Sequence, residues 1–318
     1  MASAAGSGQM KNENPLISTV FVNWNRCALL QAAIQSLQAQ QYPAIEYIVV
    51  DNGSTDHSVA WLRQQPDVIL IENTKNLGAS KARNQGTAMA QGAYVLYMDS
   101  DAELLTPGGL ARLVAYLEAH PRIAGASGGI YTDRETTQIW CYSPCTNWEG
   151  IYDPVQATTY QAHPAALSTC FALFRRNVVE AVGGFDEFYF YLFEDGDLCQ
   201  RIGKMGYGFY LDPAVRIVHH YAEPGRTKRG EIEFHYYHEW LRHYYLLSNW
   251  GLRRLLGSLV LKWAHPCRMK TQFGYLSWIH YIDIYFFRIL LLFFCFFYGR
   301  VKDKKWRKRM NLKNEENL

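Results

Sequence analysis

Between Ile17 and about residue 124, the chain alternates short apolar runs with amphipathic segments. The runs ISTVFVNW, YIVVD, VILIEN and AYVLYMD are rich in β-branched and aromatic residues, which is typical of buried strands. The segments between them, such as LLQAAIQSLQAQ, repeat apolar residues at helical spacing. Alternating strands and helices form βαβ units, which give a parallel sheet covered by helices on both faces. We therefore predict an α/β fold with a mostly parallel central sheet.

The pattern continues beyond residue 124 in shorter pieces. STCFALFRR and YGFYLDPAVRIVHH predict two more strands, with the acidic segment FEDGDLCQRIGKMG between them. After His220 the chain changes to helical patterns with aromatic faces. We interpret residues 1–15 as a disordered leader, residues 16–225 as one α/β domain and residues 226–318 as a helical, aromatic-rich C-terminal extension.

The cysteines indicate a reducing compartment. Seven of them are scattered along a 318-residue chain that is 49% hydrophobic, which is enough to form a core without disulfides. We expect free thiols. The first residues lack the charged and apolar stretches of a secretion signal, so we expect a cytoplasmic protein.

The positive charge is concentrated near one end. Arg300–Met310 carries seven basic residues and one acidic residue, a local charge of +6, and since the whole chain carries +3 the rest carries −3. This distribution argues against nucleic acid as a partner and favours an anionic membrane surface. The apolar run Ile289–Tyr298 has ten residues, half of the roughly 20 that span a bilayer. We expect a helix lying in the interface on the inner face of the cell membrane; a helix packed on the domain is the alternative.

Polar residues follow the apolar runs where a ligand site is expected. In open α/β sheets, ligands bind at the carboxyl ends of the strands. The place of a G-x-G-x-x-G motif after the first strand is taken by Asn23–Arg26, and no G-x-x-x-x-G-K-[ST] motif occurs. A nucleotide at this edge is therefore not held by a glycine-rich loop.

Asp99 and Asp101 form the first candidate site, directly after the fourth strand. Strand alternation puts both carboxylates on one side, where they can reach a divalent cation or a nucleotide. A cap on the following helix is the alternative. At the end of the second strand, Asp51 needs a partner such as a pyrimidine N–H, whereas Asp56 fits a helix cap.

A second acidic cluster contains Glu194, Asp195 and Asp197 and follows the aromatic segment Phe188–Phe193. Apolar surroundings raise the pKa of a carboxyl group, which suits proton abstraction from a hydroxyl. One of the three acids is expected to cap the helix that follows, and we assign this role to Asp197.

His219 and His220 end the last predicted strand. Adjacent side chains on a strand point to opposite faces, so only one of the two can face the site. A basic loop with Arg226, Lys228 and Arg229 follows, which is expected either to close over a diphosphate or to be solvated.

Together these segments resemble glycosyltransferase family 2, a group of inverting enzymes with the Rossmann-like GT-A fold. The resemblance covers Ile17 to Tyr221 and rests on the order and spacing of its motifs. In chain order these are VFVNWNR, VVDNGSTD, NLGASKARNQG, YMDSDAEL, VGGFDE, FEDGDLCQR and the final VHH. The chain departs from many relatives at Thr169 and Cys170, where they carry a Gly-Ala pair.

The resemblance implies how a nucleotide is held. It assigns Asn23, Trp24 and Asp51 to the pocket for the base. It puts Arg83 near the nucleotide and Asp99 in contact with the ribose or the metal.

It also implies the metal ligands and the catalytic base. Asp101 is the principal ligand of Mg²⁺ or Mn²⁺, and His219 is preferred over His220 as a further ligand. Asp195 is the general base, with Glu194 as the fallback assignment.

The implied activity is the inverting transfer of a sugar from a nucleotide-diphosphate donor to a hydroxyl group. The chain resembles the rhamnosyltransferase-like members that build bacterial surface polysaccharides. We therefore expect dTDP-rhamnose, or secondly a UDP-sugar, as donor and a saccharide or lipid-linked saccharide as acceptor. The alternatives are a nucleotidyltransferase acting on sugar phosphates, which normally shows a glycine-rich basic segment after the first strand, and a non-catalytic carbohydrate-binding scaffold.

Overall fold

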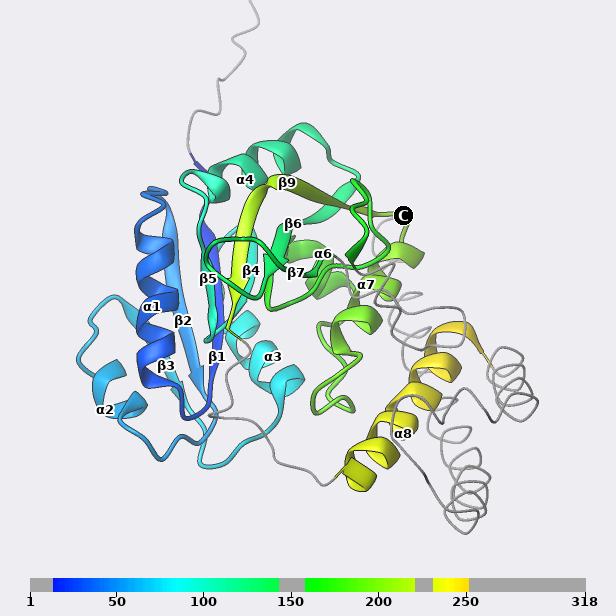
Figure 1. Cartoon of the computed structure of the whole chain (residues 1–318), viewed down its shortest axis with the longest axis horizontal. Helices are drawn as coiled ribbons and strands as arrows, with labels where there is room; N and C mark the ends of the chain where they lie inside the picture. Colours follow the sequence, from blue (N-terminus) through cyan, green and yellow to red (C-terminus); the bar gives the residue numbers. More distant parts are fainter. Residues whose placement is uncertain (1–13, 143–157, 221–230, 252–318) are drawn as a thin grey trace, which may run out of the picture.

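One sheet forms the centre of the protein. The structure is a computed structural model that describes residues 14–142, 158–220 and 231–251. Its nine-stranded sheet has the order β3-β2-β1-β4-β8-β6-β9-β5, with β7 pairing at β6 (Figure 1). The strands are β1 (Ile17–Asn23), β2 (Ile45–Asp51), β3 (Val68–Glu72), β4 (Tyr94–Asp99), β5 (Ala102–Leu104), β6 (Ile123–Tyr131), β7 (Ile139–Cys141), β8 (Phe171–Arg175) and β9 (Gly208–His219).

The first four strands are parallel, as the sequence predicts. β1 pairs in parallel with both β2 and β4, and β2 pairs in parallel with β3. The register places Asn23 opposite Asp51, and Val22 opposite Asp99. The polar residues that end β1, β2 and β4 therefore meet at one edge of the sheet.

The second half of the sheet is mixed. β8 runs antiparallel to β4 and β6, β9 is parallel to β6, and the short β5 is antiparallel to β9. β6 was not predicted because its sequence IAGASGGIY has small residues in place of an apolar run. These small residues have a packing role, since a Cβ at Gly128 would lie 2.1 Å from the carbonyl oxygen of Val215.

Helices cover both faces of the sheet, which confirms the predicted α/β architecture. Neighbouring residues of β1 belong to different cores: Phe21 packs with α1, α2 and α4, whereas Val20 packs with α3, α6 and α7. The helices are α1 (Cys27–Gln38), α2 (Ser58–Leu62), α3 (Ala79–Met89), α4 (Gly109–Ala119), α6 (Arg176–Ala181), α7 (Glu194–Lys204) and α8 (Glu231–Trp250).

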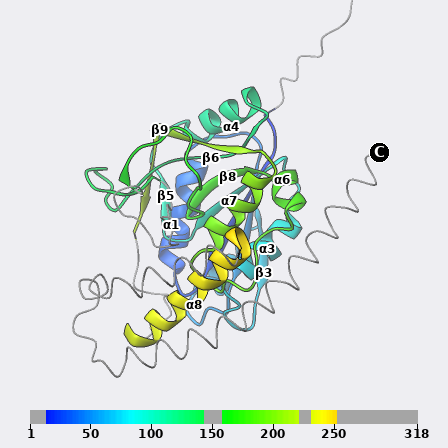
Figure 2. The same cartoon turned by 90° about the vertical axis from the view of Figure 1, so that its right-hand side faces the viewer.

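α8 lies outside the sheet and packs beside α7 (Figure 2). An aromatic cluster joins it to the segment before α7, with Phe188 and Tyr244 ring centroids 3.9 Å apart. Tyr244 also donates a hydrogen bond of 2.8 Å to the carboxylate of Asp186. α8 confirms that helical, aromatic-rich structure follows the α/β part.

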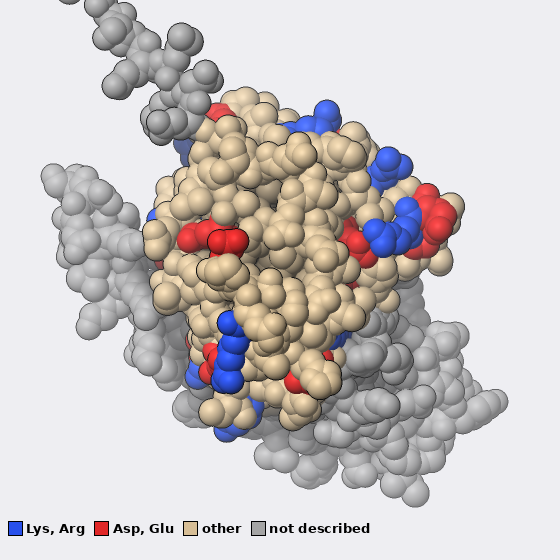
Figure 3. Space-filling view, turned by 90° about the vertical axis from the view of Figure 1, so that its left-hand side faces the viewer, with Lys and Arg blue, Asp and Glu red and all other residues tan. Residues whose placement is uncertain are grey.

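Several sequence predictions fall outside the described residues: most of the leader, the basic loop at 221–230, the apolar run at 289–298 and the basic tail. Within the described ranges, no helix combines the length and apolar character needed to cross a bilayer. Four cysteines lie in these ranges, namely Cys27, Cys141, Cys170 and Cys199, and all four are free thiols. On the face shown in Figure 3, charged side chains form small separate groups among uncharged surface.

Candidate active site

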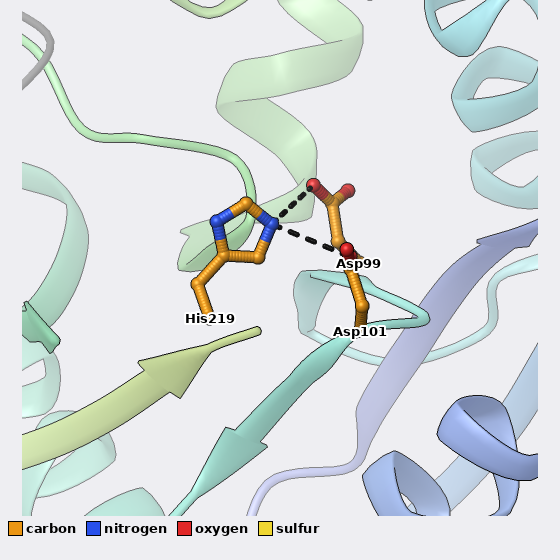
Figure 4. A group of neighbouring side chains, drawn as sticks. All are labelled: Asp99, Asp101 and His219. Carbon is orange, nitrogen blue, oxygen red and sulfur yellow. Dashed lines mark ion pairs between the residues drawn. The ribbon is translucent and has the colours of Figure 1, made fainter. Parts of the chain in front are cut away.

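Asp99, Asp101 and His219 converge at the edge of the sheet. His219 Nε2 lies 3.3 Å from Asp101 Oδ1 and 3.8 Å from Asp99 Oδ2 (Figure 4). Asp101 and His219 are buried, whereas the Asp99 side chain is 28% exposed. The preferred histidine is therefore the one that faces the two aspartates.

Local strand pairing produces this arrangement. β4 ends at Asp99 and β5 begins at Ala102, which is opposite His219 on β9. The peptide N–H of His220 donates to the Asp101 carbonyl at 2.9 Å, and its ring lies 2.6 Å from Glu103. The alternative of a helix cap for the aspartates is wrong, because a strand follows them and α4 begins only at Gly109.

The three side chains suit a divalent cation. Each offers one ligand atom, and these atoms all lie within 4.8 Å of one another. Carboxylate oxygens are preferred by Mg²⁺ and Mn²⁺, and an imidazole nitrogen is an ordinary additional ligand for transition metals. The residues present therefore fit the metal that the resemblance implies.

Arg26 and Trp140 lie next to this candidate cation site, and the sequence alone predicts no role for either. Arg26, in the loop between β1 and α1, forms an ion pair of 2.9 Å with Asp101. The ring of Trp140, on β7, lies 5.0 Å from that of His219. No sequence signal marks Trp140, since β7 belongs to a hairpin without an apolar run, whereas Arg26 stands in the VFVNWNR motif.

Arg83 joins the two acidic clusters. This buried guanidinium donates from Nη2 to Asp99 and from Nη1 to Glu194, at 2.9 Å in each case. Burial alone lowers the pKa of Arg83, but the charges of Asp99 and Glu194 more than offset this and raise it. Asp99 and Glu194 are 95 positions apart in the chain, and both pair with the Arg83 guanidinium at the edge where β4 ends.

Asp195 has an unusually basic carboxylate. Burial and the neighbouring charge of Glu194 raise its pKa to about 7, against the lowering effect of Arg83 and of N–H donors at Gly196 and Thr169. The donor at Thr169 belongs to the pair at which this chain departs from many relatives. A pKa near neutrality allows the group to accept a proton at physiological pH.

The assignment of Asp197 as a helix cap is wrong. α7 begins at Glu194, so Asp197 lies within its first turn, where it is buried and forms a 2.8 Å ion pair with Arg201. Its other oxygen accepts a hydrogen bond from Asn249 of α8 at 2.9 Å. Asp197 therefore couples α7 to α8.

The turn before α7 has a strained backbone. Leu192 and Phe193 have φ angles of 69° and 66°, in the left-handed region that non-glycine residues rarely adopt. Packing against α8 holds them there, since the ring of Phe193 lies 5.5 Å from that of Tyr245. Such strain persists only where the surrounding structure imposes it, so α8 helps to fix the start of the helix that carries Glu194 and Asp195.

Asn23 and Asp51 form a buried pair at the ends of β1 and β2. Asn23 Nδ2 donates to Asp51 Oδ2 at 3.0 Å, and the N–H of Ser54 donates to Asp51 Oδ1 at 2.8 Å. The protein itself thus supplies partners for Asp51, so the argument that this acid needs a ligand does not hold. Trp24 is half-buried in the loop that follows Asn23.

Asp56 has a structural role, although the cap position of α2 is taken by His57. Its carboxylate accepts hydrogen bonds from the N–H of Ser58, in the first turn of α2, and of Cys27, in the first turn of α1. The two helices that flank the Asp51 turn are thereby fixed to it.

The raised pKa of Asp195 predicts a pH-dependent effect of Asp195→Asn on stability. Since the pKa of about 7 in the folded protein lies above the ordinary value of 3.8 for an aspartate, wild-type protein loses stability as pH rises from about 4 to 7. The variant carries no charge there and escapes this loss. We expect its melting temperature to exceed that of the wild type by a margin that grows between pH 4 and 7 and then stays constant. If thermal melts gave a difference in melting temperature between variant and wild type that did not change with pH, the pKa of Asp195 would not be raised.

Comparison with known proteins identifies the family. The model of the glycosyl transferase family 2 matches residues 18–183, more than half of the 318 residues. The chain is 27% identical over 252 residues to N-acetylglucosaminyl-diphospho-decaprenol L-rhamnosyltransferase of Mycobacterium tuberculosis H37Rv, covering 70% of this chain and 81% of that protein. It is 39% identical over 115 residues to a putative colanic acid biosynthesis glycosyl transferase, WcaA, of Escherichia coli K12, covering 34% of this chain and 39% of that protein.

Solved structures show the same fold. The mannosyltransferase PcManGT of Pyrobaculum calidifontis, in complex with GDP-Man and Mn²⁺, superposes with a TM-score of 0.53 at 20% identity, covering 93% of this chain and 89% of that one. GalNAc-T7 with UDP, GalNAc and Mn²⁺ superposes with a TM-score of 0.56 at 16% identity, covering 80% and 55%. The fold is thus GT-A, and the chain is a glycosyltransferase that belongs to glycosyltransferase family 2.

Proposed function

We propose that this enzyme transfers a sugar, with inversion, from a nucleotide-diphosphate donor to a hydroxyl of a saccharide or lipid-linked saccharide. The observation that carries the proposal is the Arg83 bridge, because it brings Asp99 of the first acidic cluster and Glu194 of the second to one guanidinium. A donor site and a base are both required for transfer, and the bridge supports placing Asp195, which follows Glu194 in the chain, near the proposed donor site.

The donor would bind along the edge formed by β1, β2 and β4. Asn23, Trp24 and Asp51 are proposed to line the pocket for the base, at the ends of β1 and β2. Asp99, Asp101 and His219 would hold Mg²⁺ or Mn²⁺. When bound there, the cation neutralises negative charge on the diphosphate as it leaves.

Asp195 is proposed as the general base. Its carboxylate takes the proton of the acceptor hydroxyl as the oxygen forms a bond to the anomeric carbon, and the bond from that carbon to the diphosphate oxygen breaks. Attack opposite the leaving group inverts the configuration. Arg83 is proposed to position the second acidic cluster, because its guanidinium holds Glu194, the neighbour of Asp195, at 2.9 Å.

The donor and acceptor are proposed from relatives. The mycobacterial relative is named as an L-rhamnosyltransferase acting on N-acetylglucosaminyl-diphospho-decaprenol, which favours dTDP-rhamnose as donor and a lipid-linked saccharide as acceptor. A UDP-sugar is the second choice, because TarS in complex with UDP-GlcNAc shares the fold with a TM-score of 0.52. Both choices are consistent with a role in surface polysaccharide synthesis.

A lipid-linked acceptor is presented at a membrane. We propose that the enzyme is peripheral on the inner face of the cell membrane. The basic residues of Arg300–Met310 would contact anionic headgroups there.

A thermal-shift screen with dTDP, UDP and GDP, each with and without Mn²⁺, tests the proposal. A ligand that binds only the folded state raises the melting temperature, by an amount that grows with its concentration over Kd. We expect dTDP or UDP to raise it with Mn²⁺ and to do so much less with EDTA. Incubation of the matching nucleotide sugar with an acceptor should then release the nucleoside diphosphate. If none of the three nucleotides shifts the melting temperature, the proposed donor site is wrong.

A further inference from the structure

Each aspartate of the candidate cation site is paired with a different arginine. Arg83 binds Asp99 Oδ1, which leaves Asp99 Oδ2 facing His219 at 3.8 Å. Arg26 Nη1, in contrast, lies 2.9 Å from Asp101 Oδ1, the same oxygen that faces His219 Nε2 at 3.3 Å. A cation bound by all three ligands would therefore share one ligand atom with the guanidinium of Arg26.

Burial explains why this guanidinium is there. The Asp101 side chain is 0% exposed and that of Arg26 is 13% exposed. An ionised carboxylate so deeply buried is costly unless an opposite charge and hydrogen-bond donors accompany it. Arg26 supplies that charge.

We propose that Arg26 is an internal counter-ion that a divalent cation must displace from Asp101, so that metal binding is weak in the free enzyme and depends on the nucleotide. This inference rests on the proposed function. Two cations on one carboxylate oxygen repel each other at short range. The diphosphate of a donor offers the released guanidinium a new bidentate partner, which is the geometry that arginine favours.

Arg26→Gln tests the competition directly. Removing the positive charge should lower the Kd for Mn²⁺ alone about tenfold or more, because one repulsive charge beside the bound cation is lost. The Kd is measured from the electron paramagnetic resonance signal of free Mn²⁺, which requires no catalysis. Arg26→Lys keeps the charge and should stay within about threefold of wild type.

Arg63→Gln is the matched control. Arg63 forms a surface ion pair with Glu72, and its side chain is 65% exposed. Its replacement changes the net charge by the same unit but removes no charge from Asp101. We expect wild-type affinity for Mn²⁺ in this variant.

The dependence on nucleotide gives a second readout. Saturating dTDP or UDP should strongly lower the Kd for Mn²⁺ in the wild type. In Arg26→Gln, the factor by which the nucleotide lowers this Kd should be at least about tenfold smaller. By reciprocity, Mn²⁺ should improve nucleotide binding less in the variant. Mn²⁺ alone should also raise the melting temperature of Arg26→Gln more than that of the wild type, even if the metal-free variant melts earlier.

The outcomes separate this inference from the proposed function. If Mn²⁺ binds the wild type in the presence of nucleotide, but cooperatively folded Arg26→Gln binds Mn²⁺ alone no more tightly than the wild type does, the role of Arg26 is overturned and the metal site stands. If neither protein binds Mn²⁺ even with a nucleotide, the metal site and the role of Arg26 are both wrong.

Discussion

Asp195→Asn is expected to lower the rate of sugar transfer by at least about a hundredfold, the usual contribution of a general base. The amide keeps the shape of the side chain but cannot accept the proton of the acceptor hydroxyl. Nucleotide binding should be nearly unchanged, because Asp99, Asp101 and His219 are untouched. Steady-state assays of nucleoside diphosphate release, with nucleotide Kd values by calorimetry, measure the two effects separately.

The pH profile of the wild type adds an independent check. Since the carboxylate must be ionised to act as a base and its pKa is raised to about 7, kcat should rise with pH up to about 7 and level off above. Asp67→Asn, on the exposed turn before β3, is the matched control and should keep full activity. Transfer at the wild-type rate in Asp195→Asn would exclude Asp195. If Glu194→Gln lost transfer at every pH while Asp195→Asn kept it, Glu194 would be the base.

Asp101→Asn is expected to weaken Mn²⁺ binding by about a hundredfold or more in the presence of nucleotide, and to reduce transfer in proportion. Loss of residues that merely orient metal ligands costs 10- to 100-fold in affinity, and Asp101 is a proposed ligand itself. The substitution keeps the volume of this buried side chain, so the strand pairing of β5 with β9 should persist. Titration of activity with Mn²⁺ and free-Mn²⁺ resonance spectra measure both effects.

His219→Ala should act in the same direction, because the imidazole faces the same two carboxylates. His120→Ala, at the exposed end of α4, is the control. Its activity should depend on the Mn²⁺ concentration as that of the wild type does. Equal sensitivity to EDTA in Asp101→Asn and the wild type would contradict the metal role of Asp101.

The parallel half of the sheet was predictable because its strands are continuous apolar runs, and the positions of Asp51 and Asp99 follow from where those runs end. The second half was not, since β5 is only three residues long and β6 is built from small residues. Their pairing depends on close backbone approach, which leaves no periodic pattern in the sequence. The order of the motifs nevertheless pointed to Asp99, Asp101 and His219, whose ligand atoms lie within 4.8 Å of one another.

What the sequence could not reveal is which charges pair. Arg83 was expected near a nucleotide, but its buried position between Asp99 and Glu194 depends on α3 and α7 lying on the same face. The sequence predicts Asp197 as the cap of the helix, whereas α7 begins three residues earlier, at Glu194. The helix begins at Glu194 because contacts with α8, far along the chain, hold the strained Leu192–Phe193 turn.

Anomalous diffraction from a crystal of the enzyme with Mn²⁺ and dTDP or UDP tests the central claim most directly. We predict one strong manganese peak within coordination distance of Asp99, Asp101 and His219, with the diphosphate against it and the Asp195 carboxylate facing the same space. A manganese and nucleotide bound away from these three residues, or an Asp195 separated from them by the body of the protein, would contradict the account.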